Sequence, residues 1–321
     1  MSSGTQKIPV IVTARVKLND LVTRFEFRHA DGHDLPHFSG GAHIVVEMRD
    51  GDKTRLNPYS LMSDPMDPHH YAISVRRDDQ GRGGSVFMHD KVQVGDRMVV
   101  SYPVNLFPLD LTAKKHLMIA GGIGITPFMS QIRQLERLPA RFELHYAVRS
   151  AALASYADDL RTRHPLQVHV YHDDQGERIA LETLLRGQPL GTHIYVCGPR
   201  GMIDWVLGTA TELGWPATAL HYEEFLAPQS GTPFVVELAA SGKTVTVGEH
   251  ESLLEAIERA GVDAPYMCRG GACGQCETRV IRHDGTILHN DHWLEEEEHA
   301  SGEKIMPCVS RFDGKTLVLD R

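Results

Sequence analysis

Four cysteines in the last sixty residues restrict what this chain can fold into more than any other feature. Cys268, Cys273 and Cys276 lie within the nine residues CRGGACGQC, and Cys308 follows after 31 intervening residues. This C-x4-C-x2-C…C spacing is that of the plant-type 2Fe-2S site, in which four thiolates hold the cluster. The glycines between the cysteines let backbone N–H groups approach the cluster sulfurs and tune its potential. The sequence therefore predicts a metal centre made by these four cysteines.

Two other metal centres are weaker interpretations of the same cysteines. A structural zinc site is also rich in thiolates, but it usually pairs two C-x2-C sequences, and this region has one. A Rieske centre would replace two thiolates with histidines, whereas here all four cysteines are accounted for. The zinc interpretation leaves one alternative function of a different class, a zinc-holding protein-docking module without electron transfer. A visible spectrum separates the two, because zinc is colourless.

The rest of the composition is that of a globular chain with few possible classes of partner. The chain has 321 residues, a formal net charge of -9 and no run of Lys or Arg, so its long-range field repels nucleic acid and anionic membranes. No segment approaches the roughly 18 apolar residues that a membrane-spanning helix needs. The first ten residues lack the apolar stretch of a signal peptide. We expect a cytoplasmic protein that binds neither nucleic acid nor membrane.

Hydrophobic periodicity divides the chain into three predicted domains. Residues 1–110 contain short alternating segments separated by Gly, Pro and Asp, which predict an antiparallel β-barrel or sandwich. Residues 111–226 alternate apolar strands with helix-like segments, which predicts a parallel, doubly wound α/β sheet. Residues 227–233, rich in Pro, Gly and Ser, form a predicted linker. Residues 234–321 form a small α+β unit around the cysteines.

The middle region contains two glycine-rich sequences that favour a dinucleotide site. The first, AGGIGITP at 120–127, follows a predicted strand and opens a helix, so its N–H groups can approach a pyrophosphate. The second, YVCGPRGM at 195–202, ends another predicted strand. Each is weak alone, and an isolated strand cysteine is by default a buried core residue. The pair favours a nicotinamide site with candidate contacts at Gly122, Gly124, Pro127, Gly198 and Pro199.

The first region contains a loop suited to a terminal phosphate. GRGGS at 81–85 opens a predicted helix and offers backbone N–H groups, a hydroxyl and a guanidinium. These groups suit FMN, because its phosphate ends the molecule. The candidate contacts are Arg82, Gly83, Gly84 and Ser85.

Together these motifs resemble those of the phthalate dioxygenase reductase family. The resemblance implies a β-barrel flavin domain, an α/β nicotinamide domain and a β-grasp ferredoxin domain, in that order. It implies Tyr59 and Ser60 as flavin contacts and Phe225 as the ring that stacks on the flavin, with a core aromatic as the alternative for Phe225. The family's arginine is replaced here by Leu56 and Asn57, and Arg55 lies one step further back as a candidate phosphate contact. The catalytic residues assigned on this basis are Cys197, Thr126 and Glu223.

The expected function follows from the three predicted sites. A hydride carries two electrons and a 2Fe-2S cluster accepts one, so a flavin must lie between them. We expect the reductase component of a Rieske-type oxygenase system, which passes electrons from NADH through FMN and the cluster to the oxygenase. NADH is expected over NADPH because the segment 147–156 has no basic cluster for a 2′-phosphate. The alternative enzyme is an FAD-containing reductase of a diiron monooxygenase, in which the ferredoxin usually comes first.

Overall fold

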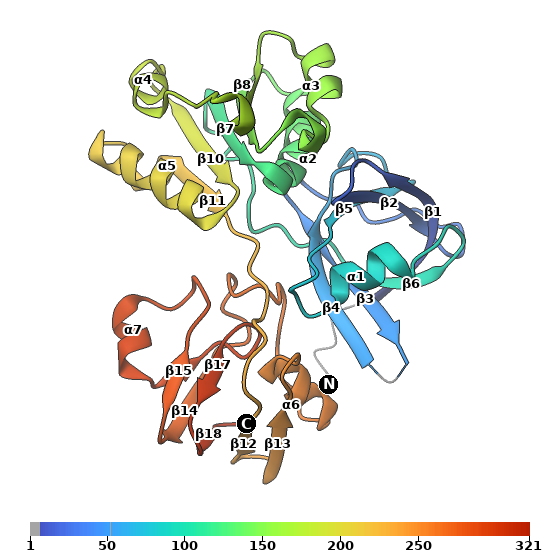
Figure 1. Ribbon diagram of the computed structural model, residues 1–321, viewed down its shortest axis with the longest axis vertical. Helices are drawn as coiled ribbons and strands as arrows, with labels where there is room; N and C mark the ends of the chain where they lie inside the picture. Colours follow the sequence, from blue (N-terminus) through green and yellow to red (C-terminus); the bar gives the residue numbers. More distant parts are fainter. Residues whose placement is uncertain (1–6, 52) are drawn as a thin grey trace.

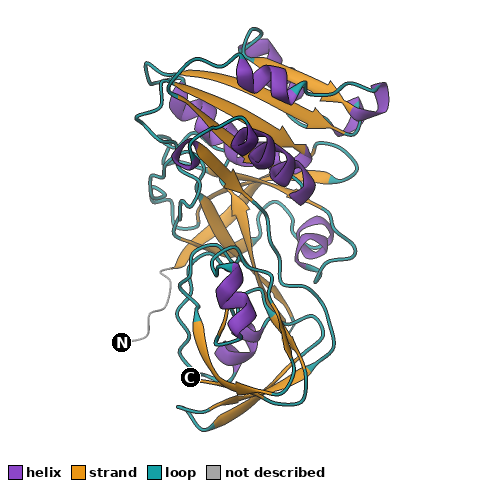
Figure 2. Ribbon diagram, turned by 90° about the vertical axis from the view of Figure 1, so that its left-hand side faces the viewer, coloured by secondary structure: helices purple, strands orange, loops and turns teal. Residues whose placement is uncertain are grey.

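A computed structural model describes residues 7–51 and 53–321, and Figure 1 shows three units that follow one another along the chain. We call them the barrel unit (β1–β6), the parallel-sheet unit (β7–β11) and the cysteine unit (β12–β18). Figure 2 shows the cysteine unit at the bottom, with a helix lying across its curved sheet. No helix in the described part of the chain is long and apolar enough to cross a membrane.

The barrel unit is a six-stranded antiparallel sheet in the order β4-β3-β6-β1-β2-β5. Successive side chains of a strand point to opposite faces, so every second residue fills the interior, as Phe25 and Phe27 of β2 do. Helix α1 (Gly84–Asp90) packs its Met88 against this core. The antiparallel barrel and its one helix are therefore as predicted. The strands are β1 (Lys7–Lys17), β2 (Val22–His29), β3 (His43–Asp50), β4 (Lys53–Ser60), β5 (Tyr71–Arg76) and β6 (Arg97–Ser101).

The parallel-sheet unit has five parallel strands in the order β11-β10-β7-β8-β9. The sheet begins at the central strand β7 and first adds β8 and β9 on one side. The chain then adds β10 and β11 on the other side of β7, so the switch point lies between β7 and β10. Helices α2 and α3 cover one face of the sheet, and α4 and α5 cover the other. The doubly wound prediction is confirmed. The elements are β7 (Lys115–Gly121), α2 (Thr126–Leu135), β8 (Arg141–Val148), α3 (Ala157–Arg163), β9 (Val168–His172), α4 (Leu181–Arg186), β10 (Thr192–Cys197), α5 (Arg200–Glu212) and β11 (Leu220–Glu223), with 3-10 turns η1 (Gly122–Ile125), η2 (Ala151–Leu153), η3 (Asp173–Gln175) and η4 (Ala217–Ala219).

One helix of this unit differs from the sequence pattern. The apolar spacing predicts a helix near 153–161, but α3 begins only at Ala157, after a separate 3-10 turn. Tyr156 interrupts the helix with a left-handed φ of 69°. Its hydroxyl lies 2.6 Å from Ser74 Oγ in the barrel unit, and Ser155 Oγ accepts a bond from Asn19 Nδ2 at 2.9 Å. Contacts with the barrel unit therefore decide where the helix begins.

The cysteine unit has a mixed sheet in the order β13-β12-β18-β14-β16 and a separate β15-β17 pair. Ser252 and Glu255 form a capping box at the start of α6, and Gly261 follows the helix with a φ of 67°, as a C-terminal cap requires. The sequence pattern missed β14 to β17, of which β15, β16 and β17 have only two or three residues each. The elements are β12 (Phe234–Leu238), β13 (Lys243–Val247), α6 (Leu253–Arg259), β14 (Thr278–His283), β15 (Thr286–Leu288), α7 (Glu296–Ser301), β16 (Lys304–Ile305), β17 (Arg311–Asp313) and β18 (Leu317–Leu319).

Candidate functional site

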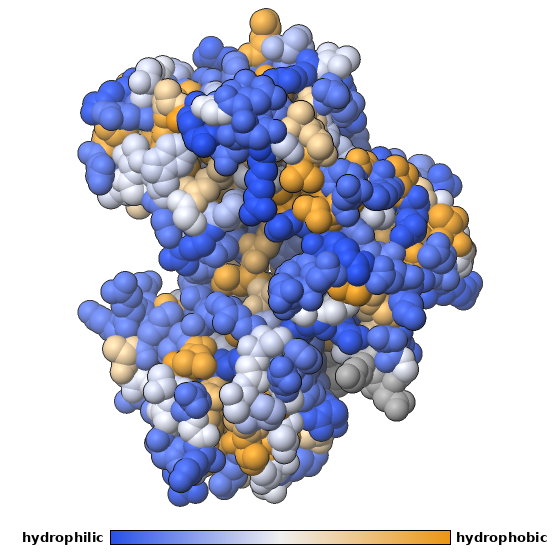
Figure 3. All heavy atoms as spheres, in the orientation of Figure 1, coloured by the Kyte–Doolittle hydropathy of each residue, from blue (hydrophilic) through white to orange (hydrophobic). Residues whose placement is uncertain are grey.

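All three units line one cavity of about 480 Å³, which is within the range of about 300–1,000 Å³ typical of small-molecule sites. In Figure 3 the surface is hollowed where the cysteine unit meets the other two units. The barrel unit contributes β4 and the loop at 81–85. The parallel-sheet unit contributes the start of α2, the end of β11 and the residues that follow it, and the cysteine unit contributes the start of its cysteine loop and His292. Nine predicted site residues line the cavity: Tyr59, Ser60, Arg82, Gly84, Ser85, Thr126, Glu223, Phe225 and Cys268.

Strand β4 supplies the polar wall of the barrel unit. Asn57 and Tyr59 lie two residues apart, so both side chains are on the same face, and Asn57 Nδ2 donates to the Tyr59 hydroxyl at 3.4 Å. Burial raises the pKa of Tyr59 above its usual range, so the phenol stays neutral and can donate a hydrogen bond. Arg55 is not among the cavity-lining residues. The Nε of Arg55 donates to the carbonyl oxygen of Arg82 at 3.0 Å, so Arg55 stabilises the backbone of the loop at 81–85.

The loop at 81–85 is held on both sides. Ser85 Oγ accepts from the backbone N–H of Asp78 at 3.0 Å. Gly83 has a φ of 88°, a left-handed conformation that glycine adopts without strain. The Arg82 guanidinium reaches the cavity wall, but two of its nitrogens donate to Glu255 of the cysteine unit, at 2.7 Å and 3.0 Å. The sequence does not indicate this partner.

The two glycine-rich sequences of the parallel-sheet unit pack directly on one another. β7 and β10 are neighbours, with Ala120 paired to Cys197, so their following turns meet. A Cβ atom on Gly124 would lie 2.2 Å from the carbonyl oxygen of Cys197, and one on Gly121 would lie 2.7 Å from Pro199. Only glycine permits this approach. Gly122, Gly198 and Pro127 are in the same cluster of turns, which places Thr126 on the cavity wall.

Cys197 and Glu223 end neighbouring parallel strands and are register partners. The Cys197 side chain is buried, and burial raises the pKa of its thiol well above the usual range, so it is a neutral thiol rather than a nucleophile. Burial also raises the pKa of Glu223 to about 8, and its Oε2 has no hydrogen-bond partner among the described residues. Burial therefore favours the protonated carboxyl group of Glu223 near neutral pH.

Phe225 and His292 complete the wall between the parallel-sheet unit and the cysteine unit. Phe225 is 46 % exposed and lines the cavity, so the alternative of a core aromatic is wrong. His292 also lines the cavity, and its Nε2 lies 2.7 Å from Glu224 Oε2 across the two units. No sequence motif pointed to His292, because its partner Glu224 lies in another unit.

The four predicted cluster ligands lie together in the cysteine unit. Hydrogen-bond contacts pair Cys268 with Cys273 and Cys276 with Cys308. The bond from the Cys273 thiol and the backbone N–H of Gly270, 3.3 Å from Cys268 Sγ, lower the pKa of Cys268. The same contacts raise the pKa of Cys273 and Cys308, so one thiol of each pair is favoured as the thiolate. Four sulfur ligands and inward N–H groups are what a 2Fe-2S cluster requires. The donor set therefore fits the cluster, and Cys268, which also lines the cavity, is its ligand nearest to the other sites.

The fold and the shared cavity define a three-unit reductase with a C-terminal ferredoxin. Residues 101–220 match the family model of the dimethylamine monooxygenase subunit DmmA-like N-terminal domain, and residues 236–313 match the 2Fe-2S iron-sulfur cluster binding domain. The chain is 43 % identical to the carnitine monooxygenase reductase subunit of Acinetobacter baumannii, over 100 % of both chains. It is 44 % identical to the heme-dependent oxidative N-demethylase beta subunit of Ectopseudomonas mendocina, over 98 % of both chains.

Among solved structures, phthalate dioxygenase reductase superimposes with a TM-score of 0.88 at 33 % identity, over 98 % of both chains. The structure of that protein is described as modular, for electron transfer from pyridine nucleotides to a 2Fe-2S cluster. The chain belongs to the phthalate dioxygenase reductase-like family of oxygenase reductase subunits. The predicted family and fold class are confirmed.

The buried Glu223 makes stability depend on pH. Its pKa is about 8 in the fold, against an ordinary value of 4.5, so the folded chain holds a proton that the unfolded chain releases between these values. Its contribution to stability is therefore lost as pH rises from 4.5 through about 8. We expect Glu223→Gln to raise the melting temperature relative to the parent, and by more at pH 8 than at pH 5.5. Glu212→Gln, an exposed substitution on α5, should show no such difference. An equal effect of Glu223→Gln at both pH values would contradict the raised pKa.

Proposed function

We propose that this chain is the reductase component of a Rieske-type oxygenase system, and that it passes electrons from NADH through FMN and a 2Fe-2S cluster to the oxygenase. The observation that carries this proposal is the single cavity, whose wall joins the predicted flavin residues, the predicted nicotinamide residues and the cluster ligand Cys268. When bound, the flavin accepts a hydride from NADH and releases electrons one at a time, as a 2Fe-2S cluster requires. The clustered thiolates also favour the reducing cytoplasm as its location.

The barrel unit supplies the residues that would hold FMN. Asn57, Tyr59 and Ser60 offer hydrogen bonds from β4, and Phe225 offers an aromatic ring in the same cavity. Arg82 and Ser85, which also line the cavity, would contact the terminal phosphate together with the backbone of Gly83 and Gly84. Arg55 acts through the loop, because its guanidinium bonds to the Arg82 carbonyl. FMN fits this loop because its phosphate is terminal, which also argues against FAD.

The parallel-sheet unit supplies the nicotinamide site. Gly122, Gly124, Gly198 and Pro199 form the tight turns that would receive NADH, with Pro127 at the start of α2. The catalytic set is Cys197, Thr126 and Glu223. Burial keeps the Cys197 thiol and the Glu223 carboxyl neutral, so neither would repel the electron-rich hydride donor, and the protonated carboxyl can orient it by a hydrogen bond. The domain limits that we propose are 1–110, 111–226 and 234–321, with a linker at 227–233.

The electron acceptor is proposed from the names of the relatives. The relatives named above serve oxygenases, one of them described as heme-dependent. A segment of a self-sufficient cytochrome P450 monooxygenase, 41 % of that chain, is 34 % identical to this one. A heme-containing oxygenase is therefore a second candidate acceptor. Reconstitution with purified oxygenases of both classes, assayed by NADH-dependent product formation, tests this choice.

Anaerobic addition of NADH to the purified protein should bleach both the flavin bands and the broader iron–sulfur absorbance. Both sites lie on one cavity wall, so the flavin and the cluster should be reduced in sequence. Stopped-flow absorbance spectra check this result. Bleaching of the flavin with an unchanged cluster spectrum would mean that the proposed electron route is wrong.

Replacement of Cys273 by Ser should separate the two halves of the route. A serine oxygen is a poor ligand for this iron, so the cluster should be lost, whereas the barrel and parallel-sheet units have cores of their own and should stay folded. The variant should still reduce ferricyanide with NADH, and should fail to reduce cytochrome c or the oxygenase.

Gln275→Ser is the matched control, because Gln275 is an exposed residue of the same loop and keeps all four thiolates. It should retain the cluster and both activities. Support of the oxygenase at the parental rate by Cys273→Ser would show that electrons bypass the cluster.

A further inference from the structure

Arg82 connects the barrel unit to the cysteine unit. Its Nη1 donates to Glu255 Oε2 at 2.7 Å and its Nη2 donates to Oε1 at 3.0 Å. The side chains are only 9 % and 13 % exposed, so the pair is shielded from water. Within residues 7–51 and 53–321, this is the only ion pair between these two units.

Glu255 is fixed in both position and charge. Its Oε2 also accepts from the backbone N–H of Ser252 at 2.8 Å, as part of the capping box that begins α6. Burial opposes ionisation, but the bonds from Arg82 outweigh it and lower the pKa of Glu255, so the carboxylate is charged. The carboxylate is therefore a rigid anchor on α6.

Helix α6 carries this anchor to the cluster loop. Glu258 lies one turn after Glu255, and residues three apart share one side of a helix. Glu258 forms an ion pair with Arg269, whose side chain is 4 % exposed. Arg269 is the neighbour of Cys268, the cluster ligand that lines the cavity. One chain of contacts therefore runs from the predicted phosphate loop, through α6, to the cluster ligand nearest the flavin site.

We propose that Arg82 is a positioning residue that docks the cysteine unit on the barrel unit, and that Glu255 thereby sets where Cys268 lies against the cavity. This inference rests on the proposed function. It is compatible with a phosphate contact for Arg82, because a guanidinium has five N–H donors and Glu255 takes two of them. Loss of the carboxylate charge should let the cysteine unit move away, since a buried guanidinium without its partner is better solvated in water.

Glu255→Gln tests the proposal, because Gln retains one oxygen for the Ser252 N–H, removes the charge and replaces the second oxygen that accepts from Arg82 with an NH2 group. In the holoprotein, flavin bleaching by NADH should keep its parental rate. The rate of cluster bleaching should fall at least about tenfold, the scale of a charge-assisted pair. Small-angle X-ray scattering should show an increased radius of gyration, a readout that is independent of turnover.

Two controls isolate the ion pair from helix capping and from net charge. Ser252→Ala breaks the capping box but leaves Arg82 paired, and Glu251→Gln removes a carboxylate that pairs with Arg259 inside the cysteine unit. Both should transfer electrons to the cluster at the parental rate. If Glu255→Gln also matches the parent in cluster rate and radius of gyration, the positioning role is wrong. If the parent cluster is not reduced by NADH, the proposed function itself has failed.

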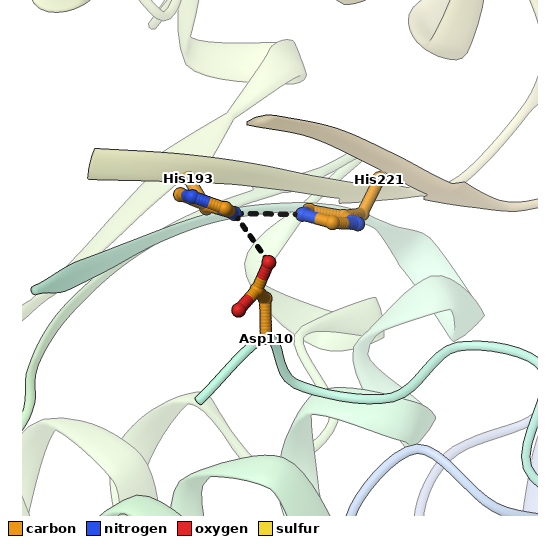
Figure 4. Close-up of side chains that lie close together, drawn as sticks. All are labelled: Asp110, His193 and His221. Atoms are coloured by element: carbon orange, nitrogen blue, oxygen red, sulfur yellow. Dashed lines mark hydrogen bonds and ion pairs between the residues drawn. The ribbon is translucent and has the colours of Figure 1, made fainter. Parts of the chain in front are cut away.

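A second cluster of side chains lies near the start of β10, at the end of the strand away from Cys197. Figure 4 shows His193 of β10, His221 of β11 and Asp110 of the connection before β7 facing one another. His193 Nδ1 lies 2.9 Å from His221 Nε2 and 3.5 Å from Asp110 Oδ2. A tetrahedral ion with bonds of about 2.05 Å separates its ligands by roughly 3.3 Å, which lies between these distances.

Neighbouring groups hold these side chains in place. Asp110 Oδ1 accepts from both the backbone N–H and the hydroxyl of Thr112, at 2.8 Å and 2.6 Å, which leaves Oδ2 toward the histidines. The Tyr195 ring stacks on His221, with centroids 4.5 Å apart.

We infer that Asp110, His193 and His221 form a binding site for a divalent zinc-like cation, with water at the open position because the side chains are partly exposed. The ion would cross-link the segment that joins the barrel unit to β7, through Asp110, with strands β10 and β11. After incubation with Zn²⁺ and dialysis against metal-free buffer, the holoprotein should retain one equivalent of zinc, measured by mass spectrometry.

His193→Asn should lose this zinc and retain NADH–ferricyanide activity, which shows that it is folded. The matched control is His169→Asn, in a second group where Glu143 is already paired with Lys115 at 2.6 Å. The control should retain the zinc. Equal zinc in parent and His193→Asn, or none in either, would mean that the three side chains form only a hydrogen-bonded cluster.

Discussion

The arrangement of the functional site depends on one close approach of two backbones. β7 and β10 are adjacent parallel strands, and the turn after β7 crosses the end of β10 with no space for a side chain at Gly124. A Cβ atom there would lie 2.2 Å from the Cys197 carbonyl oxygen, which no side-chain rotation could relieve. Because the turns meet, Thr126 and the ends of β10 and β11 converge on the cavity. The proposed nicotinamide contacts therefore exist only as a consequence of the doubly wound topology.

Near this close approach of the two backbones, burial rather than ion pairing sets the protonation state of the titratable groups at the ends of β10 and β11. Among the described residues Cys197 and Glu223 have no cationic partner, and desolvation holds both in the neutral form. In the cysteine loop, hydrogen bonds from the Cys273 thiol and the Gly270 N–H lower the pKa of Cys268, whereas the pKa of Cys273 is raised. Burial therefore sets the protonation of the first two groups, and contacts between neighbouring thiols set that of the cysteines.

Contacts between the units make the site continuous. The barrel and parallel-sheet units meet through Tyr156 with Ser74 and Ser155 with Asn19. The cysteine unit meets the barrel through Arg82 and Glu255, and meets the parallel-sheet unit through His292 and Glu224. Each of these side chains is polar and at least partly buried. The barrel and parallel-sheet units also share apolar packing, because Met62 and Ala72 of the barrel unit belong to the same buried core as Phe128 of α2. The buried core of the cysteine unit consists of its own residues.

Much of the fold and site could be predicted from the sequence, because their signals are local. Cysteine spacing predicted the cluster ligands, the two glycine-rich sequences predicted a nicotinamide site in the α/β region, and period-two and helical patterns predicted most of the strands and helices. Local signals could not reveal that Arg82 meets a residue 173 positions away, that Phe225 is exposed, or that Tyr156 breaks its helix. Those features depend on which surfaces of separate units come together. Packing between units has no period along the chain, so only the tertiary structure decides it.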